Sequence, residues 1–263
     1  MSPIYVPGKV TLRQTWQPMD PDAAAYITAV ETADGQALEE KVKIAIDNFV
    51  LGCKVDGIWS AIKASCILAG ARTLNGALVP IKGTAPTNYN FVSGDYDRET
   101  GLKGDGSTKY LDSNRAGNDD PQNNAHLAVF ATLAPTNDAA LAGSFGTTGT
   151  QITLAPTTSS FARLNTFTSV DVGSLFSGLG LCGVQRSSSS QFTARGSKNS
   201  VLYSIISGPP SELDFYIFAR NLVGNYAYTN ARIAFYSIGE FLDLALLDAR
   251  VTDLINAIGV AIP

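Results

Sequence analysis

The sequence predicts a mainly β protein, an antiparallel β-sandwich or barrel with helices at both ends. From residue 84 onward, short runs of aromatic and β-branched residues alternate with clusters of Gly, Asn, Asp, Ser and Thr, which is typical of many short strands joined by turns. The regular alternation of strands and helices that builds a parallel sheet is absent. We therefore expect an extended arm over residues 1–20, a small helical region over 21–83, and a β-domain with a C-terminal helix over 84–263.

The arm combines prolines with hydrophobic residues. Its apolar and polar residues alternate loosely near Trp16, which favours an extended segment or a short strand. Apolar side chains are unfavourable in water, so we expect the arm either to pack on its own domain or to dock on a partner. The candidate anchoring residues are Ile4, Tyr5, Val6 and Trp16.

The helical region is predicted to hold three helices. The first begins at Pro21 after the capping residue Asp20 and ends at Asp34. Apolar residues at three- and four-residue spacing predict a second helix over Gln36–Leu51 and a third over Asp56–Gly70. We expect these helices to pack on one another or on the sheet, and the alternative is a helical collar that makes oligomer contacts.

The β-domain is predicted from eleven candidate strands and a tail helix over Phe241–Ile258. Each strand is a short apolar run bounded by turn residues. The strands are expected at Tyr89–Val92, Tyr110–Asp112, His126–Leu133, Leu141–Phe145, Gln151–Ala155, Ser160–Phe167, Gly178–Val184, Ser190–Ala194, Ser200–Ser207, Leu213–Asn221 and Arg232–Gly239.

The composition argues against several classes of protein. Charged residues make up 16% of the chain and the formal net charge is −4, whereas a nucleic-acid binder usually presents a basic face. No apolar run reaches the ~20 residues needed to cross a bilayer, and we expect no membrane insertion and no signal peptide. Cys53, Cys66 and Cys182 lack metal-site spacing and are predicted to be buried, reduced thiols.

Three short motifs are better explained as turns or strands than as ligand sites. Gly178–Gly183 matches a dinucleotide fingerprint but no helix follows it, and Gly104–Lys109 lacks the Gly-Lys-Ser/Thr order of a phosphate loop. Asp95, Asp97 and Glu99 have the alternate spacing of a calcium loop, yet the glycine and the last carboxylate are misplaced. Charged turn residues are the simpler interpretation, with calcium left open, and we predict no metal or cofactor.

Candidate catalytic residues are few. Glu212 and Asp214 come closest to the same-face carboxylates of a glycosidase, but we expect them to point to solvent. His126 is the single histidine and the only available imidazole base, and no nucleophile elbow accompanies it. We therefore predict that the protein is not an enzyme.

Two polar loops are candidate receptor- or glycan-binding sites, over residues 112–124 and 223–230. Amides and charged groups hydrogen-bond sugar hydroxyls, and aromatic rings cover the apolar side of a sugar ring. Ordinary hairpin loops have the same composition, so that alternative stays open. The candidate residues are Asn114, Arg115, Asn225, Tyr226, Tyr228 and Asn230.

Longer stretches carry a resemblance to a known class of domain. Gly94–Asp112 resembles the opening of a laminin-G-like, concanavalin A-like jelly roll, and Asp214–Arg220 and Ala231–Gly239 resemble the last two strands of such a domain. With Tyr26–Pro80 included, the chain is similar to virion proteins of tailed bacteriophages over residues 22–263. The resemblance implies a jelly-roll sandwich, although such folds serve many functions.

The resemblance further implies a non-enzymatic virion structural protein of the tail-fibre or tail-tip type, displayed to recognise a host surface glycan or protein. Its expected partners are other virion proteins of the tail or capsid and further copies of itself, with a homotrimer favoured. Its expected location is the virion surface, after synthesis in the host cytoplasm. The alternatives are a capsid decoration or cement protein, a polysaccharide-active glycosidase and a cellular lectin.

Overall fold

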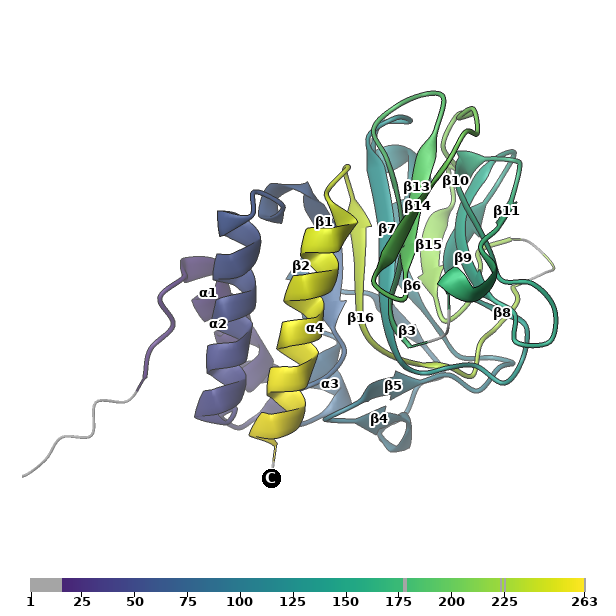
Figure 1. Ribbon diagram of the computed structural model, residues 1–263. Coiled ribbons are helices and arrows are strands. Elements are labelled where there is room, and N and C mark those ends of the chain that lie inside the picture. Colours follow the sequence, from purple (N-terminus) through teal and green to yellow (C-terminus); the bar gives the residue numbers. More distant parts are fainter. Residues whose placement is uncertain (1–15, 177–178, 223, 225, 263) are drawn as a thin grey trace, which may run out of the picture.

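The computed structural model describes residues 16–176, 179–222, 224 and 226–262. Within them, two antiparallel β-sheets pack face to face, and a layer of helices covers the outer face of one sheet (Figure 1). We call the helix-covered sheet A and the other sheet B. The predicted antiparallel β-sandwich with a helical region before it and a helix after it is confirmed.

Sheet A has nine strands among the described residues, and β7 and β16 lie at its centre. Strand β5 pairs with β16 on one edge and with β4 on the other, so these two short strands branch from the main order. The main order is β14 (Asn199–Tyr203), β13 (Phe192–Gly196), β12 (Gly180–Arg186), β7 (Ala125–Leu133), β16 (Arg232–Gly239), β1 (Ile62–Ile67) and β2 (Pro80–Lys82), with β4 (Tyr96–Asp97) and β5 (Gly101–Lys103) beside them.

Sheet B has seven strands among the described residues, and one of its faces is turned away from the helices (Figure 1). Its short strand β15 lies between β8 and β6 and is hydrogen-bonded to both. The order is β11 (Val170–Asp171), β10 (Phe161–Thr166), β9 (Gly149–Leu154), β8 (Ala139–Phe145), β15 (Asp214–Ile217), β6 (Tyr110–Ala116) and β3 (Thr87–Tyr89).

Two hydrophobic cores hold these layers together. One lies between the sheets, where residues such as Leu111, Ile152 and Ile217 are fully buried. The other lies between sheet A and the helices, where Phe49 of the helical layer meets Phe235 of β16 edge to face, with ring centroids 5.7 Å apart. Both faces of sheet A are therefore covered. The outer face of sheet B is accessible along β3, β6 and β15, whereas β8 and β9 are buried on both faces.

The first helix begins and ends where its capping residues predict, whereas the second helix and the tail helix each begin and end three or four residues later than predicted. Helix α1 (Pro21–Asp34) follows Asp20, whose carboxylate accepts from two backbone N–H groups of the first turn, and it ends at Gly35 in the left-handed region. Helices α2 (Glu40–Val55) and α4 (Leu244–Ala261) pack side by side although they are far apart in the sequence (Figure 1). Helix α3 (Leu74–Ala77) is a single turn.

The third predicted helix, over Asp56–Gly70, is wrong. Its apolar stripe belongs to a short 3₁₀ turn at Trp59–Ala61 and then to strand β1, which lies between β16 and β2. Ile62 and Cys66 have the four-residue spacing of a helix face, but the alternation of Ile62, Ala64 and Cys66 with polar residues fits the strand that forms. The segment after α2 therefore contributes to sheet A.

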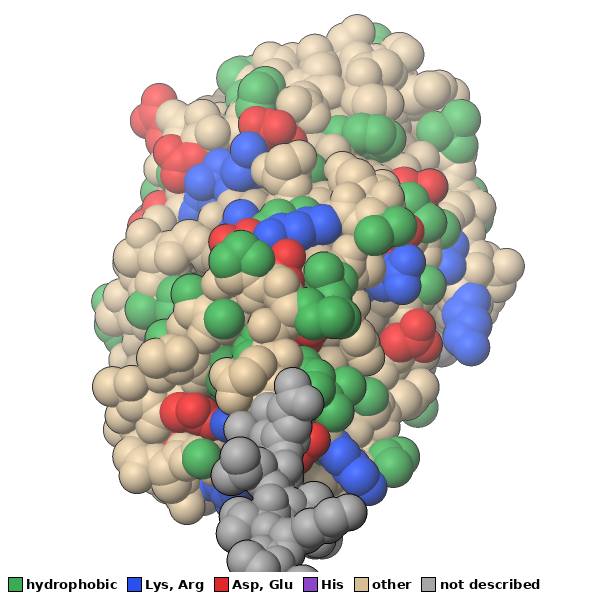
Figure 2. Space-filling view, turned by 90° about the vertical axis from the view of Figure 1, so that its left-hand side faces the viewer, with side chains coloured by type: hydrophobic (Ala, Val, Ile, Leu, Met, Phe, Trp, Pro, Cys, Tyr) green, Lys and Arg blue, Asp and Glu red, His purple; other side chains and the backbone are tan. Residues whose placement is uncertain are grey.

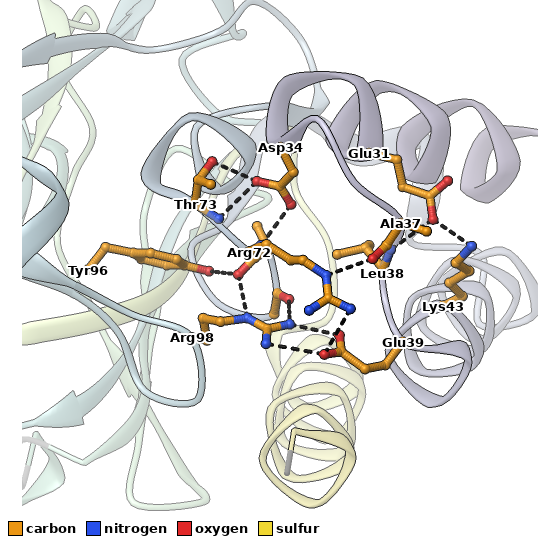
Figure 3. A network of polar contacts seen from close by, with 12 residues as sticks. Glu31, Asp34, Ala37, Leu38, Glu39, Lys43, Arg72, Thr73, Tyr96 and Arg98 are labelled. Atoms are coloured by element: carbon orange, nitrogen blue, oxygen red, sulfur yellow. Dashed lines mark hydrogen bonds and ion pairs between the residues drawn. The ribbon is translucent and has the colours of Figure 1, made fainter.

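A polar network joins the helices to the loops at the end of sheet A (Figure 3). The Arg98 guanidinium donates two hydrogen bonds to the Glu39 carboxylate, at 3.2 and 2.7 Å, and also contacts backbone carbonyls of Gly70 and Ala71. The arginines around Glu39 keep the pKa of its carboxyl below the usual value despite the opposing effect of burial. Bidentate pairs of this kind fix orientation as well as charge.

The helical face carries both signs of charge. Figure 2 shows acidic and basic side chains interspersed with hydrophobic ones over this side of the molecule. Trp16 is half-buried and packs against the core under the helices, while Ile4, Tyr5 and Val6 of the predicted anchor lie outside the described residues. In the described part of the chain, we find no helix with the length and hydrophobicity to span a bilayer.

Candidate functional site

The outer face of sheet B gathers polar and aromatic side chains because strand residues alternate between the two faces of a sheet. On β15, Phe215 and Ile217 are buried in the sandwich, which leaves Asp214 and Tyr216 on the outer face. On β6, Leu111 is buried and Tyr110 and Asp112 take the outer face.

The strand register places one row of outer-face residues across six strands. Each residue of the row pairs with the next one on the neighbouring strand. From β3 to β10 the row is Thr87, Asp112, Tyr216, Gly143, Gln151 and Arg163.

Five tyrosines cluster at the β3–β6–β15 end of this row, and we call them the tyrosine face. The rings of Tyr89 and Tyr110 are stacked with centroids 4.4 Å apart and planes 4° from parallel. Tyr110 also lies 4.4 Å from Tyr216 and 6.1 Å from Tyr228. Tyr226 closes the cluster, 6.4 Å from Tyr216 and 5.5 Å from Tyr228. The result is a continuous aromatic surface on an exposed sheet face.

The loop after β15 brings its two tyrosines to the cluster through backbone hydrogen bonds. The Arg220 N–H donates to the Tyr226 carbonyl at 2.6 Å, and the Asn137 side-chain amide donates to the Tyr228 carbonyl at 2.9 Å. Partial burial among neighbouring phenols raises the pKa of Tyr110, Tyr216 and Tyr228. These phenols therefore stay protonated at neutral pH and remain hydrogen-bond donors.

Two carboxylates lie beside the tyrosine face. Burial raises the pKa of the Asp112 carboxyl, and the nearby charge of Asp214 raises it further, while the Asn114 N–H, 2.9 Å from the carboxylate, opposes both effects. Asp112 shares its row with Tyr216, and Asp214 belongs to the same strand as Tyr216. Glu212, the other acid considered from the sequence, is exposed. Two carboxyl groups beside an aromatic surface have the composition of an acid–base pair.

The structure brings together only some of the predicted glycan-binding residues. Tyr226 and Tyr228 join the tyrosine face, while Asn225 lies outside the described residues. The side chains of Asn114, Arg115 and Asn230 serve neighbouring protein groups: they bond to Ala85 and Thr87, to Asp120, and to Thr136.

Sequence reasoning missed Tyr89, Tyr110 and Tyr216, which lie on or beside predicted strands. The alternation of polar and apolar residues in Tyr110–Asp112 and Asp214–Ile217 was a signal that these residues share a face. Their meeting depends on β15 pairing with β6, across about a hundred residues of sequence, and no local pattern specifies that pairing.

The predicted turn motifs are turns in the structure. Asp95 pairs with Lys109 at 2.5 Å, and Asp97 accepts from the Thr100 hydroxyl at 2.6 Å. The Asp105 carboxylate accepts from three successive backbone N–H groups. Across the described ranges, no cluster of three or more His, Cys, Asp or Glu side chains could hold a metal ion.

His126 is a buried structural residue. Its Nδ1 lies 2.5 Å from the Glu240 carbonyl oxygen and therefore carries the hydrogen, and its Nε2 accepts from the Ser237 hydroxyl at 2.7 Å. A serine beside an imidazole is the pair that hydrolases use, but both residues are at most 1% exposed, so a substrate has no access. The cysteines Cys53, Cys66 and Cys182 are buried, as predicted, and none of them takes part in a disulfide within the described residues.

Acidification is expected to destabilise the fold through His126. Burial lowers the pKa of its imidazole from 6.5 to about 4. Between these values the unfolded chain binds more protons than the folded one, so stability falls as the pH falls, by about 3 kcal/mol in all. Urea unfolding at pH 7, 5.5 and 4 measures this loss. A variant with His126→Gln, whose side chain does not titrate in this pH range, should lose less stability over it. Equal losses in both proteins would show that His126 does not cause the acid-induced loss of stability.

Comparisons with known proteins give similarity of fold alone. No family model matches the chain and no curated protein matches it. A mutant Trypanosoma rangeli sialidase with trans-sialidase activity is 10% identical, with 80% of this chain and 39% of that chain covered and a TM-score of 0.45. The enzymatically active domain of bacteriophage CBA120 tailspike protein 2 is 13% identical, with 67% of this chain and 30% of that chain covered and a TM-score of 0.37.

A third similar structure is domain 4 of the GH43 arabinanase AbnA from Geobacillus stearothermophilus, in complex with arabinotriose. It is 12% identical, with 66% of this chain and 82% of that chain covered and a TM-score of 0.35. The chain spans 39% of the sialidase and 30% of the tailspike domain. At these identities no residue role is carried over.

These neighbours contradict two sequence-based predictions, that the protein is a non-enzymatic virion structural protein and that it is not an enzyme. The similar structures are mostly glycosidases or parts of them, and the phage structure is itself an enzymatically active domain. Those predictions rested on the scarcity of histidine and of consecutive acids, and they did not consider carboxyl groups such as those of Asp112 and Asp214, on strands that meet only in the fold.

Proposed function

We propose that the protein hydrolyses a polysaccharide that it binds on the tyrosine face. The observation that carries the proposal is the continuous aromatic surface with Asp112 and Asp214 beside it. Tyrosine rings cover the apolar faces of sugar rings, and their phenols donate hydrogen bonds to the hydroxyls at the edges. An exposed sheet face suits a chain of linked sugars better than a single small molecule.

The two carboxyl groups supply the chemistry that glycoside hydrolysis requires. A carboxylic acid with a raised pKa protonates the oxygen of the leaving sugar, and a second, ionised carboxylate activates water or attacks the sugar carbon. Burial and the charge of Asp214 both favour the protonated form of Asp112. Asp112 is therefore assigned as the acid and Asp214 as the partner carboxylate.

If the polysaccharide binds on the tyrosine face, Tyr110→Ala should strongly weaken its binding. Tyr110 contacts three other rings of the tyrosine face, so its removal should weaken binding to the recognised polysaccharide at least tenfold, or by about 1.4 kcal/mol. Affinity electrophoresis against a panel of neutral and acidic polysaccharides measures the loss.

The matched control is Phe241→Ala, which removes an exposed aromatic residue outside the tyrosine face and should leave binding unchanged. Release of new reducing ends from the bound polymer tests hydrolysis in the same samples. Binding without any such release would refute the catalytic assignment, and equal affinities for Tyr110→Ala and the unaltered protein would refute the binding face.

A further inference from the structure

The row of outer-face residues continues beyond the tyrosine face to a cationic end. From Asp112 to Arg163 it crosses four strand spacings, which is roughly 19 Å at the usual distance between strands. Gly143 and Gln151, in the middle of the row, are buried, because Asn221 bonds to the Gly143 carbonyl and the Arg220 side chain bonds to Gln151. A polymer that extends from the tyrosine face to Arg163 on β10 would pass over this segment.

Arg163 is the central group of this cationic end. Its guanidinium lies 4.7 Å from the centre of the Phe145 ring and 5.4 Å from that of Phe161. It donates one hydrogen bond to the Phe167 carbonyl at 3.1 Å, and its Nε is buried with no hydrogen-bond partner. Within the described ranges no carboxylate pairs with Arg163, although aromatic rings and backbone surround it.

A second arginine adds positive charge at the same place. Arg220 Nη1 donates to the Gln151 side-chain oxygen at 3.4 Å, and Gln151 pairs with Arg163 in the strand register. Burial, and then the charge of Arg220, lower the pKa of Arg163 to about 10. Two half-buried guanidinium groups near each other repel, and an anion between them would relieve this repulsion. We call Gln151, Arg163 and Arg220 the arginine end.

We infer that the arginine end binds the carboxylate of an acidic sugar unit in the polysaccharide held by the tyrosine face, an inference that rests on the proposed function. Guanidinium groups match a carboxylate with two parallel hydrogen bonds. The exposed ring of Phe167, 6.0 Å from Phe145, adds an apolar surface for the same sugar. The substrate class is therefore a polymer that contains uronic or similar carboxylated sugars.

The test compares one polymer in two forms, a polyuronate and the neutral polymer made by reducing its carboxyl groups. The unaltered protein should bind the polyuronate more tightly, and added salt should diminish the preference. Arg163→Gln should weaken polyuronate binding roughly 10- to 100-fold, the value of a lost charge-assisted pair, and leave binding of the reduced polymer unchanged. Arg163→Lys, which keeps the charge without the planar fork, should bind the polyuronate more weakly than the unaltered protein and more tightly than Arg163→Gln.

Lys103→Gln is the control for charge, because Lys103 is an exposed cation on β5 of sheet A, and it should bind both polymers as the unaltered protein does. Thermal unfolding of Arg163→Gln establishes that the variant is folded. Equal weakening toward both polymers, or no weakening, would overturn the inference. A dependence on Arg163 seen only with a sulfated polymer would overturn the assignment to a carboxylate.

The same measurements separate this inference from the proposed function. If Tyr110→Ala weakens binding of the reduced polymer while Arg163→Gln leaves the polyuronate preference intact, the tyrosine face stands and the arginine end does not. If Tyr110→Ala binds every polymer as the unaltered protein does, the tyrosine face is not the binding site and the proposed function is refuted, whatever Arg163→Gln shows.

Discussion

Replacing Asp112 by Asn is expected to lower turnover of the bound polysaccharide by roughly 10²- to 10⁴-fold, the contribution that a positioned general acid makes. Asparagine keeps the size and polarity of the side chain but cannot give up a proton to the leaving oxygen. Binding should change little, because the tyrosine rings are intact. Initial rates of reducing-end release, measured beside affinity electrophoresis, separate the two quantities.

The role of Asp112 as the acid also predicts how kcat/KM depends on pH. Burial and the charge of Asp214 raise the pKa of Asp112 above its usual value, so kcat/KM should fall as the pH rises through that raised pKa and the acid loses its proton. The activity optimum is thus expected on the acidic side. Asp112→Asn should abolish this alkaline limb along with most of the rate; a variant that keeps both would remove Asp112 from the mechanism.

Glu212→Gln is the matched control, because Glu212 is an exposed acid two residues before Asp214. It should retain the rate of the unaltered protein. Asp214→Asn should lose as much activity as Asp112→Asn. The anomeric configuration of the first product, read by nuclear magnetic resonance, shows whether Asp214 activates water or attacks the sugar carbon.

Arg186→Met is expected to destabilise the fold by about 3–5 kcal/mol, a large share of the 5–15 kcal/mol of a typical domain. Arg186 is 1% exposed, and its guanidinium donates to the carbonyls of Leu164, Ser188, Gln191 and Ile205 at 2.9–3.1 Å. Methionine fills a similar volume but leaves these acceptors without donors. The bond to Leu164 crosses from sheet A to sheet B, so its loss should loosen the sandwich at that end.

Urea unfolding measures this effect, with Lys103→Met as the control for loss of an exposed cation. Arg186→Lys should be destabilised by less than Arg186→Met, since the charge and some donors remain. Burial lowers the pKa of Arg186 to about 10, so it stays charged at neutral pH and the measurement reports hydrogen bonds to a cation. A loss below about 1 kcal/mol for Arg186→Met would show that water replaces the missing donors.

The sequence predicted those parts of the fold that depend on local patterns. Asp20 and Gly35 marked the ends of α1, and the apolar runs marked most strands of both sheets. The error at β1 arose because Ile62 and Cys66 lie four residues apart, as on one face of a helix, although the alternation of Ile62, Ala64 and Cys66 with polar residues also fits a strand.

The candidate site was harder to predict because it is assembled from distant strands. Tyr226 and Tyr228 were visible as aromatic residues in a polar loop, but their partners Tyr110 and Tyr216 looked like ordinary strand residues. Asp112 and Asp214 likewise became a pair only through the pairing of β6 with β15. A register across sequence-distant strands is a tertiary property, and a single sequence does not encode it in any local period.

The helical layer on sheet A has a practical consequence for handling the protein. Trp16 packs against the core under the helices, and α4 lies in the helical layer, on the opposite side of the molecule from sheet B (Figure 1). A tether fixed at either end would therefore hold the tyrosine face outward, toward the solution. Oriented capture through a terminal tag should leave most immobilised molecules able to meet an insoluble polymer, whereas random coupling should bury part of them against the support.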